Sequence, residues 1–348
     1  MCGIHAQITS AAELSIGVRV EISREQIRAA LWDKRTLVKT EGLRGTLHLF
    51  PARELPLWLA AIRAAEDARL EQRRLADLGL TRKKIDRLVD VIAGALSAGP
   101  LSYRELGEIV TRRVRGWTTE GLGWFGGKGE KWRVAVGYAA ASGVIVYGPP
   151  RGNEVTFVLT EHWLGKLAAV DGDAALATVF RRFLRAYGPA THRDFAQWLA
   201  MAPARARNVA ASLGDEVEEV DVEGYRCLRL RDEAPPTRAK ASVRLLPHFD
   251  CYLRGFHPRA QLMAGGIERE RAGGGTGTVP VLLVDGAVAG VWQRSRTKRG
   301  GSEIVVEAFT PLSVTHRREL ERACARIGQV AGGEPTLRLG TVAIRPHL

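Results

Sequence analysis

Two stretches of this 348-residue chain match each other without a gap. They read GPLSYRELGEIV, from Gly99 to Val110, and GPATHRDFAQWL, from Gly188 to Leu199. In both, Gly-Pro ends the preceding helix, because proline cannot continue it. A Ser or Thr followed three residues later by Glu or Asp is typical of a capping box, or its Asp variant, at the start of a new helix. Each stretch therefore predicts a tight turn between two helices, the second with one buried apolar face.

The sequence around each stretch repeats as well. A helical pattern precedes each one, KKIDRLVDVIAGAL and AALATVFRRFLRAY, and a third helix follows in GEKWRVAVGYAAASG and PARARNVAASL. Two β-rich runs around a turn come next, in VIVYGPPRGNEVTFVLT and in EVEEVDVEGYRCLRL, which turns near Glu223-Gly224. Three helices and a β-hairpin in this order predict a winged helix-turn-helix. The alternative is two unrelated helical hairpins.

The N-terminus follows a similar order. Ser10-x-x-Glu13 and Ser23-x-x-Gln26 predict the starts of two helices, in AAELSIGVRV and REQIRAALWDKR. TLVKTEGLRGTLHLF then predicts a hairpin that turns at residues 42–45. Compared with the other two units, this one lacks its first helix. Either the unit is minimal or the true start codon lies upstream, and we favour the upstream start.

The C-terminal third changes character. Strand-like runs occur in SVRLLP, VPVLLVDG, AVAGVWQRS and EIVVEAF, with a hairpin signal at residues 284–286, and HRRELERACARIGQVA predicts one helix. These elements predict a small β-barrel or sandwich closed by a helix. The glycines of ERERAGGGTGTVP do not open a helix, so this segment predicts a mobile loop and not a phosphate-binding loop.

The sequence thus predicts an α+β fold of tandem winged-helix units packed against a C-terminal β-barrel. Its expected domains are 1–82, 83–170, 171–235 and 236–348.

The charge balance points to an anionic partner. The chain has 51 Lys and Arg against 38 Asp and Glu, a net charge of +13, and nucleic acid is the commonest large partner of such a protein. A membrane surface is the alternative. However, no apolar run approaches the roughly 18 residues of a membrane span, and no secretory signal is visible. The four cysteines, Cys2, Cys227, Cys251 and Cys324, are scattered, which argues against a zinc site and favours a reducing cytoplasm.

Five segments together carry a family resemblance: CGIHAQITSAAEL, LVKTEGLRGTLHLF, LRAYGPATHRDFAQWL, LLPHFDCYLRGF and VLLVDGAVAGVW. Through them the chain resembles the AlkZ-type (YcaQ-like) winged-helix DNA glycosylases over nearly its whole length. The resemblance implies removal of alkylated purines, including bulky or crosslinked adducts, by cleavage of the N-glycosidic bond. It also implies a catalytic motif, Gln-x-Gln or Gln-x-Asp, at the place where this chain has His5-Ala6-Gln7.

The chemistry of that triplet follows from its spacing. In an extended segment, residues two apart point the same way, so His5 and Gln7 would converge and Ala6 would turn away. A purine alkylated at N7 is already a good leaving group. What remains is to stabilise an oxocarbenium-like sugar and to place a water below it. A glutamine amide both donates to and accepts from that water, and a neutral imidazole can take its proton. Histidine in place of glutamine predicts a pH dependence near about 6–7. The alternative is that the pair only satisfies backbone groups.

Candidate DNA contacts lie in three places. RGTLHL places Arg44, Thr46 and His48 on one face of a strand, with Lys39 on its neighbour, which suits phosphate or sugar contact. A plain solvated hairpin is the alternative, and the acid Glu41 stands where the family pattern often has an aromatic residue. The other two places carry only basic candidates. These are Arg205 and Arg207 at the start of a helix, and Arg294, Arg296, Lys298 and Arg299 at a strand end.

The segment LLPHFDCYLRGF contributes side chains at alternate positions. Asp250 is expected either to stabilise a cationic sugar or to pair with Arg254, and Asp250 and Tyr252 are expected to line the cleft. His248 with Cys251 does not make a convincing metal pair, because no third ligand is nearby. No metal site is therefore expected.

These observations lead to one hypothesis and two alternatives. The leading hypothesis is a monofunctional DNA glycosylase that hydrolyses alkylated purines in double-stranded DNA with water. It would need no nucleotide or other cofactor and would work as a monomer, away from membranes, in the cytoplasm at the nucleoid. The alternatives are a non-enzymatic winged-helix regulator and an RNA-binding module, although no heptad or sensor pocket supports a regulator.

Overall fold

The computed structural model describes residues 2–124, 127–233, 241–255, 262–263, 278–296 and 301–343. Helices and strands are mixed along the chain, which is an α+β arrangement. The chain divides into two compact units: the first has residues 1–28, 184–194 and 215–347, and the second has 29–183, 195–214 and 348. Each unit is described by itself. The four predicted domain boundaries remain a prediction.

The second unit is mainly helical. Its elements are β2 (Leu37–Glu41), β3 (Leu47–Pro51), α3 (Leu55–Ala65), α4 (Ala68–Asp77), α5 (Arg82–Leu96), β4 (Leu101–Ser102), α6 (Tyr103–Arg113), β5 (Gly121–Trp124), β6 (Gly127–Glu130), α7 (Trp132–Ala141), β7 (Ile145–Arg151), β8 (Glu154–Leu159), α8 (Thr160–Leu164) and α11 (Pro203–Ser212). Three helices have residues in both units: α2 (Arg24–Trp32), α9 (Gly172–Tyr187) and α10 (His192–Leu199).

The three helices and the hairpin predicted for each repeat are present in the predicted order, but the first repeat also has the β5–β6 hairpin between α6 and α7, which the sequence did not predict. Helices α5, α6 and α7 are followed by the β7–β8 hairpin, and α9, α10 and α11 by the hairpin of β9 (Val217–Val222) and β10 (Tyr225–Leu230). The match extends to a detail that the sequence did not suggest. Leu101 pairs with Phe157 of its hairpin, and Ala190, the matching position, pairs with Leu228 of the other.

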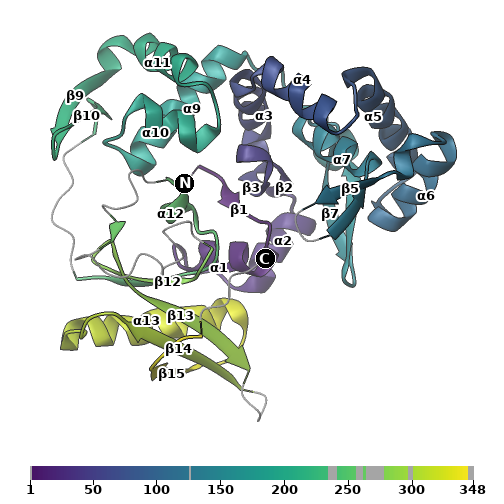
Figure 1. Ribbon diagram of the computed structural model, residues 1–348. Helices are drawn as coiled ribbons and strands as arrows, with labels where there is room; N and C mark the ends of the chain where they lie inside the picture. The colour runs from purple at the N-terminus through teal and green to yellow at the C-terminus, as the bar shows by residue number, and fades with distance from the viewer. Residues whose placement is uncertain are drawn as a thin grey trace. The chain divides into compact units, whose positions relative to one another are not determined.

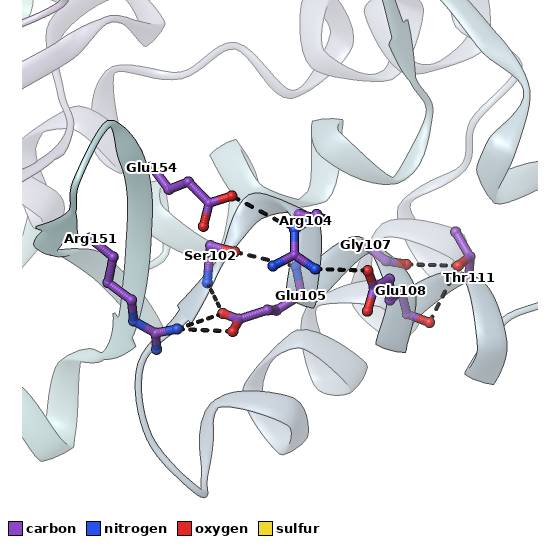
Figure 2. A network of polar contacts seen from close by, with 8 residues as sticks. All are labelled: Ser102, Arg104, Glu105, Gly107, Glu108, Thr111, Arg151 and Glu154. Atoms are coloured by element: carbon purple, nitrogen blue, oxygen red, sulfur yellow. Dashed lines mark hydrogen bonds and ion pairs between the residues drawn. The ribbon is translucent and has the colours of Figure 1, made fainter.

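The two capping boxes predicted within the repeat are present. At α6 the Glu105 amide donates to Ser102 Oγ, and the Ser102 amide donates to Glu105 at 2.7 Å. At α10 the Thr191 amide donates to Asp194 at 2.7 Å. Figure 2 shows the first box within a larger polar network, in which Arg151 binds the same Glu105. The local signals of turn and cap therefore fix where these helices begin.

The core of the second unit lies among α5, α6 and α7. The periodic residues of α5, Ile85, Leu88 and Ile92, are fully buried, and they pack in one cluster with Trp132 and Phe157. The α5 spacing predicted from the sequence thus marks the buried face of the helix.

The first unit is built around a five-stranded sheet. Its elements are β1 (Ile4–His5), α1 (Thr9–Gly17), the β9–β10 hairpin, β11 (Val243–Leu246), α12 (Cys251–Gly255), β12 (Val281–Val284), β13 (Ala287–Arg296), β14 (Ser302–Ala308), α13 (Val314–Ala331) and β15 (Thr336–Leu339). The strand order is β11-β12-β13-β14-β15, with β15 parallel to β14. The predicted turn at Asp285-Gly286 joins β12 to β13, and both residues have positive φ.

The predicted closed barrel is wrong for the described residues. The sheet has two open ends, β11 and β15, and is not joined into a ring. Its apolar face is covered instead by α13, through Leu320, Cys324 and Ile327 (Figure 1). Helix α1 adds Leu14 to the same cluster. A helix thus buries the surface that a second layer of strands would bury in a barrel. The glycine-rich segment 268–277 lies outside the described residues.

The start of α1 differs from the prediction. The helix begins at Thr9 after Ile8, with no side-chain cap, so Ser10 and Glu13 form no capping box. Glu13 is buried and accepts ion pairs from Arg24 at 3.1 Å and Arg28 at 2.9 Å. The second predicted box is confirmed, because the amide of Ser23 donates to Gln26 Oε1 at 2.8 Å. Among the described helices, none is long and apolar enough to cross a bilayer.

Candidate functional site

The His5-Ala6-Gln7 triplet lies between β1 and α1 in the first unit. The extended backbone ends at His5, and the chain bends at Gln7 into α1. His5 is 6% exposed and Ala6 is fully buried, whereas Gln7 is exposed. The predicted extended segment is therefore shorter than the triplet, and strand alternation alone does not bring the two side chains together. Gln7 is the member of the pair that solvent, or a nucleotide, can reach.

Phe249 holds the His5 ring from one side. The two ring centroids lie 4.7 Å apart with their planes tilted by 32°. Phe249 itself has a φ of 57°, a left-handed conformation that a bulky residue rarely adopts. The guanidinium carbon of Arg254 lies 5.5 Å from the centroid of the Phe249 ring. Strain of this kind persists only where the surroundings hold the residue in place.

Asp250 supplies that restraint. It is fully buried, and its carboxylate accepts from Arg19 Nη2 at 2.6 Å, Arg19 Nη1 at 2.8 Å and Ser15 Oγ at 2.7 Å. The amide of Tyr252 also donates to it at 2.9 Å, so Asp250 caps α12. Burial by itself would lower the pKa of Arg19, but the hydrogen bond and charge of Asp250 outweigh it and raise that pKa above its usual value. Asp250 thus ties the Phe249 turn to α1.

Three predictions for this segment are wrong. Asp250 pairs with Arg19 and not with Arg254, and because it has no exposed surface it does not line a cleft. The side chains do not alternate, since residues 251–255 form α12. Tyr252 is half-buried, and its hydroxyl donates to the carbonyl of Gly286 at 2.8 Å. Sequence reasoning missed Arg19 because it lies 231 residues from its partner.

An open cavity of about 480 Å³ lies in the same unit, beside the start of α1. Its walls include Ile8 and Ser10, just after the triplet, and the basic residues Arg24, His248 and Arg294, with no carboxylate. The guanidinium of Arg294 donates to Ser302 Oγ at 2.9 Å, which fixes its direction. A cavity with this lining favours an anionic group such as a phosphate. Of the other predicted basic residues at this strand end, Lys298 and Arg299, with the side chain of Arg296, lie outside the described part.

The β2–β3 hairpin of the second unit is present, but the residues predicted to contact DNA do not form a row on one face of it. Arg44 precedes the strand in a left-handed conformation with φ 58°, and it donates to the carbonyl of Trp198. Thr46 Oγ1 donates to the carbonyl of Leu43 at 2.9 Å. His48 is 2% and Lys39 8% exposed. Because the tight turn places two of these residues outside the strand, they do not share one solvent-facing side.

Glu41, at the end of β2, is half-buried. Burial raises its pKa from 4.5 to about 7, and the charge of Arg74 opposes the rise only in part. Tyr103 and Tyr147 lie near Glu41. Their own burial raises the pKa of each, and the charge of Glu41 adds to the rise.

Glu41→Gln is expected to flatten the pH dependence of stability. The folded pKa lies above the unfolded one, so the folded state binds the proton more tightly and wild-type stability falls as pH rises from about 5 to 8. The fall is on the order of 2–3 kcal/mol at 1.4 kcal/mol per pKa unit. Urea unfolding at both pH values measures it, with the exposed Glu161→Gln as control. Equal pH dependence in wild type and Glu41→Gln would contradict the assignment.

The basic residues of α11 are exposed. Arg205 forms an ion pair with Asp173, and Arg207 lies one half-turn further on. The pairing of Arg205 lowers its value as a phosphate contact, which leaves Arg207 as the better candidate of the two.

Known proteins resemble this chain over nearly its whole length. The family model for AlkZ-like DNA glycosylases matches residues 1–330. An interstrand DNA cross-link repair glycosylase of Streptomyces sahachiroi is 31% identical, over 95% of this chain and 89% of that protein. The solved structure of the Streptomyces sahachiroi DNA glycosylase AlkZ matches with a TM-score of 0.75 and 27% identity, over 97% of this chain and 91% of that one. The chain therefore belongs to the AlkZ-like family of DNA glycosylases.

Proposed function

We propose that this glycosylase hydrolyses the N-glycosidic bond of purines that carry an N7-alkyl group or a bulkier adduct, in double-stranded DNA. The observation that carries the proposal is the exposed Gln7, on a bend between β1 and α1 whose neighbour His5 is held in the interior by Phe249. The cross-link repair named for the Streptomyces relative supports a bulky adduct as substrate.

In the proposed chemistry, the protein does not need to protonate the leaving purine base. N7 alkylation makes the purine cationic, so it leaves without strong acid assistance. The amide of Gln7 accepts from and donates to a water below the sugar and orients it toward the anomeric carbon. The imidazole of His5, if neutral, accepts the proton as the new C–O bond forms. Free base and an abasic site are the products.

The cavity beside α1 supports binding of the DNA backbone close to this chemistry. Its basic residue Arg294 would contact a phosphate, and the predicted contacts Arg207, Arg296, Lys298 and Arg299 would extend the interaction. We further propose that the enzyme acts as a monomer at the nucleoid and uses no nucleotide cofactor, with winged-helix units as its DNA-binding modules.

Base release tests the proposal directly. The full-length protein is incubated with duplexes that carry N7-methylguanine, a bulky N7 adduct or an interstrand crosslink, and free base and abasic sites are quantified. Release from at least one N7 adduct, and none from undamaged DNA, is the expected result. Binding to DNA without release from any adduct would contradict the proposal and favour the non-enzymatic regulator.

A further inference from the structure

A second basic pocket lies in the second unit, and no part of the excision chemistry uses it. It is an open cavity of about 350 Å³, lined by Arg35, Arg53, Pro56, Trp163 and Lys166 with neighbouring apolar residues. We call it the Trp163 pocket. Its three cations come from the segments after α2, after β3 and after α8, so the fold brings together residues far apart in the sequence.

None of the three cations of the Trp163 pocket is paired with a carboxylate of the described residues. Within the described part of the chain, Arg35, Arg53 and Lys166 form no ion pair, and the lining includes no acidic residue. The acid nearest in sequence to Arg53, Glu54, is bound to Arg182 at 2.5 Å. Elsewhere in the same unit, Figure 2 shows Arg104 paired with both Glu108 and Glu154. Like charges that converge without a counter-charge make a positive potential that attracts an anion.

Arg35 is held in a fixed direction. Its backbone is left-handed, with φ 52°, and its guanidinium carbon lies 3.9 Å from the Trp163 ring centroid. Nη1 donates to the Trp163 carbonyl at 3.3 Å. Stacking covers a face of the guanidinium and leaves its other in-plane N–H groups at the edge, where a phosphate binds in a bidentate manner.

We propose that the Trp163 pocket binds phosphate groups of the DNA backbone, which gives the second unit a DNA contact separate from the excision site. The proposal rests on the chain's membership of a DNA glycosylase family and does not depend on the roles of His5 and Gln7. A phosphodiester and inorganic phosphate share the recognised chemistry, so the experiment includes both.

The test compares two triple variants of equal net charge. Arg35→Gln with Arg53→Gln and Lys166→Gln empties the pocket of cations. The control, Arg87→Gln with Arg317→Gln and Arg318→Gln, removes exposed, unpaired arginines of α5 and α13. Binding of undamaged duplex is measured by fluorescence anisotropy across a range of salt concentrations, so the result is independent of base release.

The pocket variant is expected to bind DNA about 10- to 100-fold more weakly near 0.1 M salt, with the slope of log K against log salt reduced by about 2–3. Single-turnover base release at saturating protein is expected to stay unchanged. Equal losses in both triple variants would overturn the proposal, because net charge alone would explain them. The proposal would also be overturned if inorganic phosphate raised the thermal midpoint of the wild-type protein through this pocket while the pocket variant still bound DNA normally.

Two further variants keep the test valid if the triple variant folds poorly. Arg53→Gln with Lys166→Gln leaves the Arg35–Trp163 stack intact and is expected to reduce the salt slope by about 2. Arg35→Lys keeps the charge but not the planar fork, and is expected to weaken DNA binding at least 2-fold with little change in slope. No effect from either variant would contradict the proposal.

Discussion

Replacing Gln7 with alanine is expected to lower single-turnover base release by about 100- to 1,000-fold and to leave DNA affinity nearly unchanged. This is the usual cost of removing one group that orients or stabilises the reacting atoms. Gln7 is exposed at the bend before α1, so its truncation leaves the core intact. Base release and binding of the same adduct duplex are measured side by side, with the exposed Gln72→Ala as a matched control.

Substitution of His5 separates its two expected roles. His5→Gln places at position 5 the glutamine that the family resemblance implies, and is expected to keep activity while replacing the titratable imidazole of the pair by an amide that does not titrate. His5→Ala removes both the acceptor and the ring that contacts Phe249, and is expected to lose activity at every pH. Full activity in Gln7→Ala, or the same pH profile in wild type and His5→Gln, would contradict the proposed pair.

The features that the sequence predicted well are local. Gly-Pro turns, capping boxes and apolar periodicity depend on residues within one or two helical turns. These signals correctly predicted the three helices and the hairpin of each repeat. The failure at α1 shows the limit of such signals. Ser10 and Glu13 have the spacing of a capping box, but the carboxylate of Glu13 is buried and binds Arg24 and Arg28, which come later in the chain, so it is not free to cap α1.

The features that the sequence missed depend on distant residues. Whether strands close into a barrel is decided by the edges of the sheet, and here α13 covers the face instead. Arg44 has the left-handed conformation that a tight turn imposes, which strand alternation does not anticipate. For the candidate site, the roles of Gln7 and His5 stay predictions. The sequence singled out Asp250 but not its partner, because nothing near Arg19 marks it as half of an ion pair.

Replacement of Asp250 by alanine is expected to destabilise the first unit by about 3–5 kcal/mol. The change leaves the Arg19 guanidinium partly buried without its counter-charge and removes acceptors for Ser15 and for the Tyr252 amide. Urea unfolding measures the loss. The exposed pair of Arg185 with Asp232 supplies the control, because Asp232→Asn is expected to cost less than about 1 kcal/mol. Equal costs for the two variants would show that burial of the Asp250 pair contributes nothing.

Asp250→Asn links this stability to the chemistry. Asparagine keeps an oxygen for the Tyr252 amide but removes the charge that binds Arg19, so the left-handed turn at Phe249 is held less firmly. Phe249 contacts His5. We therefore expect slower base release even without urea, at a temperature where the variant is fully folded. The double variant Asp250→Asn with His5→Gln distinguishes a positioning role from a general loss of stability. If Asp250 acts through Phe249 and His5, its substitution costs less rate in the His5→Gln background than in wild type. Equal costs in both backgrounds would contradict that route.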